Sequence, residues 1–304
     1  MNIFKKLFRI LIGIFVVLFI ICAVLFFLAE PAPDHSYFKP DNFLVIAHRG
    51  GRSLGPESTL YTFQRAVELG ANVLEMDVQS TKDGHMVVLH DRTVDRTTNG
   101  TGPVGNYTLA ELKNLDAAYH WSPDNGRTYP LRNKDVRIPT LTEVFRAFPK
   151  TRVNIEIKDP KLSEIPSFCG SIRDHNMSTK VMVASFDAGV LKEFRLVCPE
   201  VATSAGFTEA FLFYFLQKIR MESVYSPDMQ AMQIPETRDN RQVVNRRFVE
   251  AAHARNMRVH VWTINDIESM KQYLKLGVDG IMTDYPDRLI KLLKISIKAN
   301  YSEN

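Results

Sequence analysis

The sequence of 304 residues contains only three cysteines and carries almost no net charge, and both shortages exclude classes of site. No two cysteines form a Cys-x-x-Cys pair, so a cysteine zinc site is not expected. Cys22 lies within a long apolar run, which leaves Cys169 and Cys198 as the only two that can pair with each other. The 38 basic and 34 acidic residues give a net charge of +4. This balance lacks the basic footprint of a nucleic-acid-binding domain, so no nucleic-acid partner is expected.

One long hydrophobic run is present, at the N-terminus. Residues 10–29 are uncharged, and as a helix they span about 30 Å, the thickness of a bilayer core. Residues 1–9 carry three basic and no acidic side chains, while Glu30 and Asp34 follow the run. The positive-inside rule predicts a membrane anchor with residues 1–9 in the cytoplasm and the rest of the chain on the other side, periplasmic or extracellular in a bacterium. A cleaved signal peptide is the alternative, although its apolar region is normally about 7–15 residues long.

Strand-like runs and helical patterns alternate from residue 43 onward, which is typical of an α/β protein. Eight such strands, each followed by a helix or an insertion, predict a (β/α)8 or TIM barrel over residues 43–297. An open doubly wound sheet is the alternative, but it usually has a glycine-rich phosphate fingerprint after the first strand, and His-Arg-Gly-Gly at 48–51 is not one. The predicted strands are 43–47, the run from 73, 153–158, 180–186, 201–205, 229–234, 258–263 and 280–283, and the predicted helices are 59–69, 164–175, 188–197, 209–221, 240–255, 267–276 and 286–297.

Three segments lie outside this alternation. Residues 30–42, with prolines and mixed charges, are predicted to be a linker between the anchor and the barrel. Residues from about 92 to 137 are loosely patterned and contain one short helix, for which Thr108 and Glu111 form a capping box. A loose segment of this length within a compact domain is usually functional, so we expect a small cap insertion over a site. Residues 298–304 are predicted to be a tail.

The stretch 73–91 carries the first candidate site. Glu75 and Asp77 lie two residues apart in an apolar strand, so both side chains point to the same face. Burying two carboxylates together is unfavourable unless a cation lies between them, and divalent metal ions prefer such oxygen ligands. A surface hairpin with ordinary solvated charges is the alternative.

A turn at residues 82–85, with Asp-Gly at its centre, joins this strand to a second one. Folding the two strands about that turn sets Thr81 opposite Met86 and Asp77 opposite His90. We therefore expect two acids and an imidazole at one end of one hairpin.

In a barrel, the residues at the carboxyl ends of the strands form the site. Glu156 lies on the predicted strand 153–158 and supplies a third carboxylate beside Glu75 and Asp77. Three carboxylates favour Mg²⁺ or Ca²⁺, and zinc is not expected without a cluster of histidines and cysteines. The residues predicted for this rim are His48, Arg49, Glu75, Asp77, His90, Glu156, Lys158, Ser185, Gln233 and Trp262.

The other rim residues favour phosphoester cleavage. His48 and His90 titrate near neutral pH and suit general acid and base catalysis, although each alone is more often a structural histidine. Arg49 offers a planar donor fork to a phosphate oxygen, and Lys158 offers a point charge. Trp262 is either a core residue or an aromatic wall of the site. Together, beside three acids, these residues predict a metal-assisted phosphodiesterase.

The apolar segment 207–216 has two interpretations. A barrel helix is normally apolar along one stripe, yet residues 211–216 are apolar all round. The helix is either more deeply buried than usual, or it receives an acyl chain or dips into a bilayer. A non-catalytic, membrane-anchored lipid-binding protein on a barrel is the alternative from another class.

Several motifs, taken together and in order, resemble the glycerophosphodiester phosphodiesterase family. They are HRGG at 48–51, GPEST at 55–59, LEMDVQSTKDGHMVVLHD at 74–91, NIEIKD at 154–159, VHVWTIND at 259–266 and VDGIMTDYPD at 278–287. The similarity covers residues 43 to about 290. The family commonly has Asn where Ser58 stands, a departure that concerns only a helix-capping detail.

The resemblance implies a barrel of the phospholipase-C-like phosphodiesterase type with a divalent cation. It implies the acid/base pair His48 and His90, the metal ligands Glu75, Asp77 and Glu156, and the phosphate contacts Arg49 and Lys158. The implied reaction is hydrolysis of glycerophosphodiesters to glycerol 3-phosphate and an alcohol. The membrane-anchored branch of the family also includes lysophospholipase D enzymes, which release lysophosphatidic acid, so a lysophospholipid is the alternative substrate.

Overall fold

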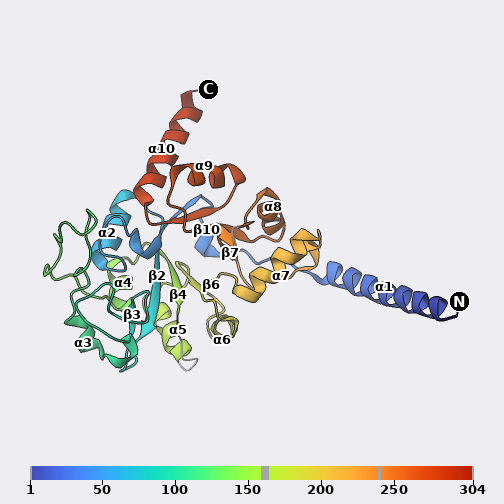
Figure 1. Ribbon diagram of the computed structural model, residues 1–304, viewed down its shortest axis with the longest axis horizontal. Helices are drawn as coiled ribbons and strands as arrows, with labels where there is room; N and C mark the ends of the chain where they lie inside the picture. The colour runs from blue at the N-terminus through green and yellow to red at the C-terminus, as the bar shows by residue number, and fades with distance from the viewer. Residues whose placement is uncertain (1, 159–163, 239–240, 303–304) are drawn as a thin grey trace.

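Eight parallel strands form a barrel in the computed structural model, which describes residues 2–158, 164–238 and 241–302 (Figure 1). The strands pair in the order β6-β5-β4-β2-β1-β11-β10-β7, and the short β3 (Met86–Val88) pairs antiparallel with β2. The order and direction confirm the predicted (β/α)8 barrel. The strands are β1 (Leu44–Ala47), β2 (Val73–Ser80), β4 (Arg152–Ile157), β5 (Val181–Ala184), β6 (Ala202–Thr203), β7 (Ala231–Pro235), β10 (Arg258–Trp262) and β11 (Gly280–Thr283).

The barrel closes between its shortest strand, β6, and β7. Gln230 N donates to Thr203 O at 3.1 Å, and Ala205 N donates to Ala231 O at 2.8 Å. Ser204 and Ala231 form a parallel bridge between the two strands. These few contacts join the two ends of the strand order, so the sheet has almost no open edge.

Helices surround the barrel and bury its outer face. The strands are almost continuously buried, which explains why they were recognisable as apolar runs in the sequence. The helices of the ring are α2 (Leu60–Leu69), α4 (Leu141–Ala147), α5 (Ile165–Asp174), α6 (Ala188–Val197), α7 (Phe207–Lys218), α8 (Arg246–Ala254), α9 (Ile267–Leu276) and α10 (Pro286–Ser302).

One predicted helix, 240–255, begins too early. Residues Arg241–Gln242 form strand β9, which pairs antiparallel with β8 (Thr237–Arg238), and residues 239–240 lie outside the described part. Helix α8 begins after Asn245, whose side chain accepts a hydrogen bond from Phe248 N at 3.0 Å. The Asn245 cap therefore sets the start of the helix, and the residues before it extend the rim of the barrel.

The hairpin of β2 and β3 has a register one residue away from the predicted one. Thr81 N donates to the carbonyl four residues later at 2.9 Å, so the turn holds three residues, and Gly84 adopts a left-handed φ of 79°. Asp77 O accepts from Leu89 N at 3.0 Å, so Asp77 lies opposite Leu89. The prediction that Asp77 lies opposite His90 is wrong, because the left-handed glycine closes a shorter loop.

The insertion between β3 and α4 packs as a small layer with its own core. It contains the short helix α3 (Leu109–Lys113), which begins with the predicted capping box. In Figure 1 the insertion lies on the side of the barrel away from the N-terminal helix. Its buried apolar residues, which pack with Val87 and Leu89, are Val94, Val104, Leu112, Ala117, Ala118, Val136 and Ile138.

The N-terminal helix α1 (Asn2–Leu28) projects away from the barrel (Figure 1). Its stretch Phe4–Leu28 contains an 18-residue window with a mean hydropathy of 3.4, and in the described part of the chain this is the one helix long and apolar enough to cross a membrane. Helices of this kind are either membrane spans or signal sequences.

The segment after α1 is bound tightly under the barrel. Ala32 N donates to Arg255 O at 2.9 Å, and Arg152 Nη2 donates to Lys39 O at 2.6 Å. Tyr37 is fully buried in one cluster with residues of β1, β2 and β7. Because Arg152 begins β4, the segment covers the amino-terminal end of the barrel, opposite the predicted site.

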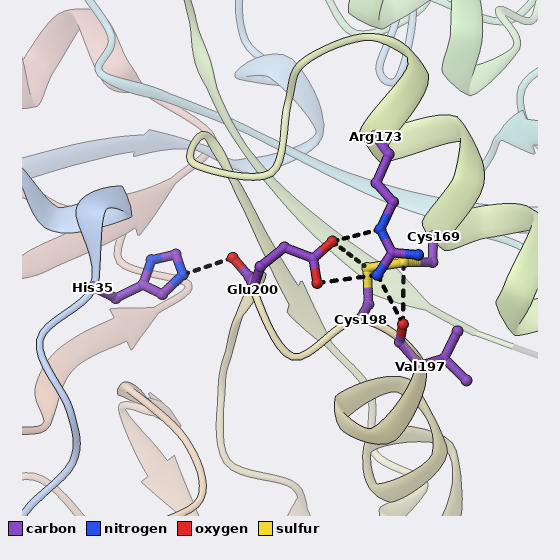
Figure 2. Close-up of a disulfide and its surroundings, with 6 residues drawn as sticks. All are labelled: His35, Cys169, Arg173, Val197, Cys198 and Glu200. Atoms are coloured by element: carbon purple, nitrogen blue, oxygen red, sulfur yellow. Dashed lines mark hydrogen bonds and ion pairs between the residues drawn. A yellow bond between two sulfur atoms is a disulfide. The ribbon is translucent and has the colours of Figure 1, made fainter.

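A disulfide joins α5 to the end of α6 (Figure 2). Cys169 and Cys198, the two cysteines that the sequence left free to pair, have their sulfurs 2.07 Å apart. Beside them, Arg173 Nε donates to Glu200 Oε1 at 2.6 Å, and His35 Nε2 lies 3.0 Å from Glu200 O. The disulfide region is thus also tied to the segment that follows α1.

Candidate active site

All ten residues predicted for the rim line one cavity of about 1120 Å³. The cavity lies at the carboxyl ends of the strands, the end that forms the site in barrel enzymes. His48 and Arg49 follow β1, Glu75 and Asp77 lie on β2, and Glu156 lies on β4. Trp262 ends β10, and its ring is 6.2 Å from that of Phe186, so it forms part of an aromatic wall. The structure therefore brings together the side chains that the sequence placed at one rim.

A carboxylate orients His48. Its Nδ1 lies 2.7 Å from Oδ1 of Asp284, which follows β11, and Asn265 Nδ2 donates to Asp284 Oδ2 at 2.9 Å. Burial raises the pKa of Asp284, but the hydrogen bond with His48 and the positive charge of Arg52 outweigh it, so the pKa lies below its usual value. An ionised carboxylate only accepts, so Nδ1 of His48 carries a proton and Nε2 is the nitrogen left for chemistry.

His90 is held in the same way by its neighbour. Its Nδ1 lies 2.6 Å from Asp91 Oδ1. Burial raises the pKa of Asp91, but hydrogen bonds from Arg96 and His90 lower it to about 2. For His90, burial lowers the pKa and outweighs the effect of Asp91. Both histidines thus have a carboxylate on Nδ1 and an available Nε2.

The three carboxylates share the cavity with two cationic side chains. Asp77 and Glu156 are register neighbours on β2 and β4. Lys158 Nζ lies between them, 3.0 Å from Asp77 Oδ1 and 2.8 Å from Glu156 Oε1. Arg49 Nε is 3.7 Å from Asp77 Oδ2, and Arg49 N donates to Glu75 Oε2 at 2.7 Å. Both residues predicted to contact phosphate therefore contact the predicted metal ligands.

The donor set fits a hard cation. Burial raises the pKa of Glu75 well above its usual value, and the negative charge of Asp77 raises it further. Burial, followed by repulsion from Asp77, also raises the pKa of Glu156 despite Lys158. Asp77 Oδ2 is buried without a hydrogen-bond partner in the described part of the chain. A divalent cation stabilises buried carboxylates that repel one another, particularly where one oxygen accepts no hydrogen bond.

The carboxylates are not drawn together into a tight cluster. In the described ranges, the one group of three metal-ligating residue types whose ligand atoms all lie within 4.8 Å of one another is Cys169, Cys198 and Glu200. The two sulfurs of that group are bonded to each other, so it is not a metal site.

Sequence reasoning missed the residues that hold the site residues in place. Glu57, which lies just before α2, accepts from Arg49 Nη1 at 3.0 Å. Asp91 directly follows His90 in the sequence, so a contact between the two side chains could have been predicted. Asp284 is 236 residues from His48, and only the pairing of β11 with β1 brings it close.

A parallel eight-stranded barrel with two carboxylate-oriented histidines and three carboxylates at its carboxyl end belongs to the class of barrel phosphodiesterases. The chain belongs to the glycerophosphoryl diester phosphodiesterase family, whose model matches residues 48–288. Members of this family generally depend on a divalent metal ion.

Individual relatives agree with the family. A glycerophosphodiester phosphodiesterase of Caldanaerobacter subterraneus is 37% identical over 258 residues, which cover 83% of this chain and 98% of that protein. A human lysophospholipase D is 27% identical and matches 83% of this chain and 87% of its own. A solved structure of an Oleispira antarctica phosphodiesterase in complex with sn-glycerol-3-phosphate has a TM-score of 0.67 and 25% identity, and the match covers 86% of this chain and all of the other.

Proposed function

We propose that the cavity hydrolyses glycerophosphodiesters to glycerol 3-phosphate and an alcohol. The observation that carries the proposal is the pair of histidines, each with a carboxylate on Nδ1, in one cavity with three carboxylates and two cations. This constellation supplies an acid, a base and charge neutralisation, which phosphodiester cleavage requires.

His48 and His90 are the proposed acid/base pair. The Nε2 of one takes the proton of the nucleophile, which is either water or the neighbouring glycerol hydroxyl of the substrate. The Nε2 of the other donates a proton to the leaving alcohol oxygen. Asp284 and Asp91 keep each Nδ1 protonated, so each ring presents the correct nitrogen. If the glycerol hydroxyl attacks first, water opens the resulting cyclic phosphate with the two roles exchanged.

Glu75, Asp77 and Glu156 are the proposed ligands of a divalent cation, Mg²⁺ or Ca²⁺. When bound, such an ion neutralises charge on the phosphate oxygens. Arg49 and Lys158 are the proposed phosphate contacts, and Trp262 with Phe186 forms a wall for the alcohol portion.

The alternative substrate is a lysophospholipid. Phe207, Ala210, Phe211 and Tyr214 of α7 form an apolar wall of the cavity, and an acyl chain suits such a wall. The human relative is named a lysophospholipase D. A water-soluble diester such as glycerophosphocholine does not need this wall.

We also propose that α1 is an uncleaved anchor, with residues 1–9 in the cytoplasm and the barrel, residues 43–297, on the other side. The disulfide supports this orientation, because disulfides persist mainly in oxidising compartments. In this organisation residues 30–42 connect the anchor to the barrel, residues from about 92 to 137 are its insertion, and 298–304 are a tail.

The test is incubation of the purified full chain with glycerophosphocholine and with lysophosphatidylcholine, each with Mg²⁺, Ca²⁺ or EDTA, and identification of the products by mass spectrometry. We expect glycerol 3-phosphate and choline from the first substrate, and none with EDTA. Lysophosphatidic acid from the second, with little action on the first, would favour the alternative. No turnover of either with any metal would favour a lipid-binding protein.

A further inference from the structure

Helix α7 carries an exposed apolar stripe, here called the α7 face, made of Phe207, Phe211, Leu212, Phe215 and Ile219. Phe207, Phe211, Phe215 and Ile219 are spaced by four, so they share one side of the helix. Their exposed fractions run from 43% at Phe207 to 61% at Phe211. In the described part of the chain, every other helix of the barrel exposes at most two large apolar side chains. Of the two earlier interpretations, deep burial of this helix is therefore excluded.

The α7 face continues into the cavity. Phe207 and Phe211 belong to both surfaces, and their rings are stacked 6.4 Å apart. Phe186, 59% exposed, extends the apolar surface across the mouth towards Trp262. An apolar path therefore leads from the outer surface of α7 to the site.

The anchor holds this side of the barrel close to the membrane. Helix α1 packs against the short helix η5 (Glu222–Val224), which directly follows α7. Glu30 N donates to Ser226 Oγ at 3.3 Å, only two residues beyond the end of α1 at Leu28. Two extended residues span about 7 Å at most, so the barrel must lie close to the bilayer surface at the end of α1. In Figure 1, α7 is the barrel helix nearest to the inner end of α1.

The charges at the end of α7 suit a lipid surface. Lys218 and Arg220 are exposed where the helix ends, next to the apolar stripe. An apolar stripe with basic residues at its edge is typical of helices that lie in the interface of an anionic bilayer.

We infer that the α7 face inserts into the bilayer that α1 spans, so that this face connects the lipid surface near the end of α1 to the cavity at the carboxyl end of the barrel. The occupant of the α7 face is then lipid, and the diester that reaches the site along Phe207 and Phe211 is carried by the membrane, as a lysophospholipid is. Membrane insertion of the α7 face rests on the proposed orientation of α1. The route of the substrate along this face rests on the proposed function as well.

The first test measures depth with the full chain in vesicles of phosphatidylcholine and phosphatidylglycerol. A Cys22→Ala background leaves only the disulfide cysteines, and a fluorophore is attached at Phe215→Cys, at Ile219→Cys, or at the control Leu69→Cys. Leu69 is 40% exposed on α2, which follows β1 on the opposite side of the barrel from β6. We expect brominated lipid to quench the labels at 215 and 219, and iodide in the water to quench the label at 69.

Quenching of all three labels by iodide alone would overturn the insertion. A second result would also overturn it: the labels at 215 and 219 are protected from both quenchers, and this protection is lost when the protein is diluted in lipid. Such a result indicates that a second copy of the chain covers the α7 face.

The second test compares substrates, using the variants Phe215→Glu and Leu69→Glu. Phe215 does not line the cavity, so the turnover of soluble glycerophosphocholine should not change. Turnover of lysophosphatidylcholine in vesicles should fall roughly tenfold with Phe215→Glu, because a charge opposes insertion, and should not fall with Leu69→Glu. Equal turnover of the vesicle substrate by both variants would overturn the route through α7. Absence of turnover in the wild type would contradict the proposed function and leave the depth measurement to decide the insertion.

Discussion

Arg96 and Glu57 are joined by two hydrogen bonds, from Nη1 to Oε2 at 2.8 Å and from Nη2 to Oε1 at 2.6 Å. Each also holds a residue of the site: Glu57 accepts from Arg49, and Arg96 Nε donates to Asp91 at 2.6 Å. Burial raises the pKa of Glu57, but Arg96 and the other arginines lower it to about 2. Arg96, which belongs to the insertion, thus connects Glu57, which holds Arg49, to Asp91, which holds His90.

Arg96 is therefore expected to be a positioning residue. Arg96→Gln should lower kcat roughly 10- to 100-fold with a small change in KM, as is usual when an outer support of a site is lost. Arg96→Lys should recover part of the loss. The control is Arg132→Gln, because Arg132 lies in the same insertion between the rings of Tyr119 and Tyr129. Equal kcat values for Arg96→Gln and the wild type would contradict the role.

The histidines should be required for turnover but not for folding. Alanine at His48 or at His90 should lower kcat by about 10²- to 10⁴-fold, the usual contribution of general acid–base catalysis. His85→Ala, at an exposed position directly after the hairpin turn, should be neutral. Activity and circular dichroism are measured together, and a variant of either site histidine with near-normal turnover would contradict its assignment.

The carboxylates should bind a divalent ion at some expense of stability. Calorimetric titration with Mg²⁺ or Ca²⁺ should give binding heat in the wild type and none in Glu75→Gln. In EDTA, Glu75→Gln should have the higher Tm, because burial and Asp77 disfavour the charge of Glu75. A gain of 1 kcal/mol corresponds to roughly 2–4 °C in a domain of this size. The control is Glu68→Gln, at an exposed position of α2. A lower Tm for Glu75→Gln than for the wild type would refute the repulsion between Glu75 and Asp77.

Stability should fall in acid partly because of His260. This residue is fully buried, and burial lowers its pKa from 6.5 to about 4. Its folded pKa lies below its unfolded pKa, so its contribution is complete above pH 6.5 and is lost as the pH falls towards 4. Over the whole range, the free energy of unfolding falls by roughly 3 kcal/mol because of this group. His260→Leu should therefore lose less free energy of unfolding between pH 7 and pH 4 than the wild type, in urea titrations with detergent. The same loss in both proteins would show that His260 does not titrate in this range.

The disulfide should contribute to stability. It closes a loop with a sequence separation of 29 residues, for which chain entropy predicts about 3–4 kcal/mol. The double variant Cys169→Ala/Cys198→Ala should lose about that much free energy of unfolding, and a reductant should have no further effect on it. Cys22→Ala is the control. Identical unfolding curves for the wild type with and without reductant would contradict the contribution.

The barrel and its rim were predictable because both depend on local patterns. Parallel strands that are buried on both sides, such as β2 and β4, give apolar runs in the sequence, and the polar residues at their ends then fall at one rim. Glu75, Asp77 and Glu156 could be placed together in this way before any distance was known.

The contacts between distant segments were not predictable. Asp284 reaches His48 only through the pairing of the first and last strands, and Arg96 reaches Glu57 across 39 residues. The hairpin register depended on the left-handed conformation of Gly84, since turns of three and four residues both accept an Asp-Gly pair. The two long-range contacts follow from the closure of the barrel, and the register follows from one backbone conformation, and the pattern of apolar and polar residues specifies neither.

Tyr37 determines where the protein can be shortened. Its ring fills the amino-terminal end of the barrel although it precedes the first strand, and the loss of such a buried aromatic side chain costs about 3–5 kcal/mol. A soluble fragment that starts at the first strand would leave that end open, whereas one that starts at residue 30 keeps it filled. The piece of chain that leads to the membrane is therefore also the bottom of the catalytic domain, and the two cannot be cut apart at the boundary that the strands suggest.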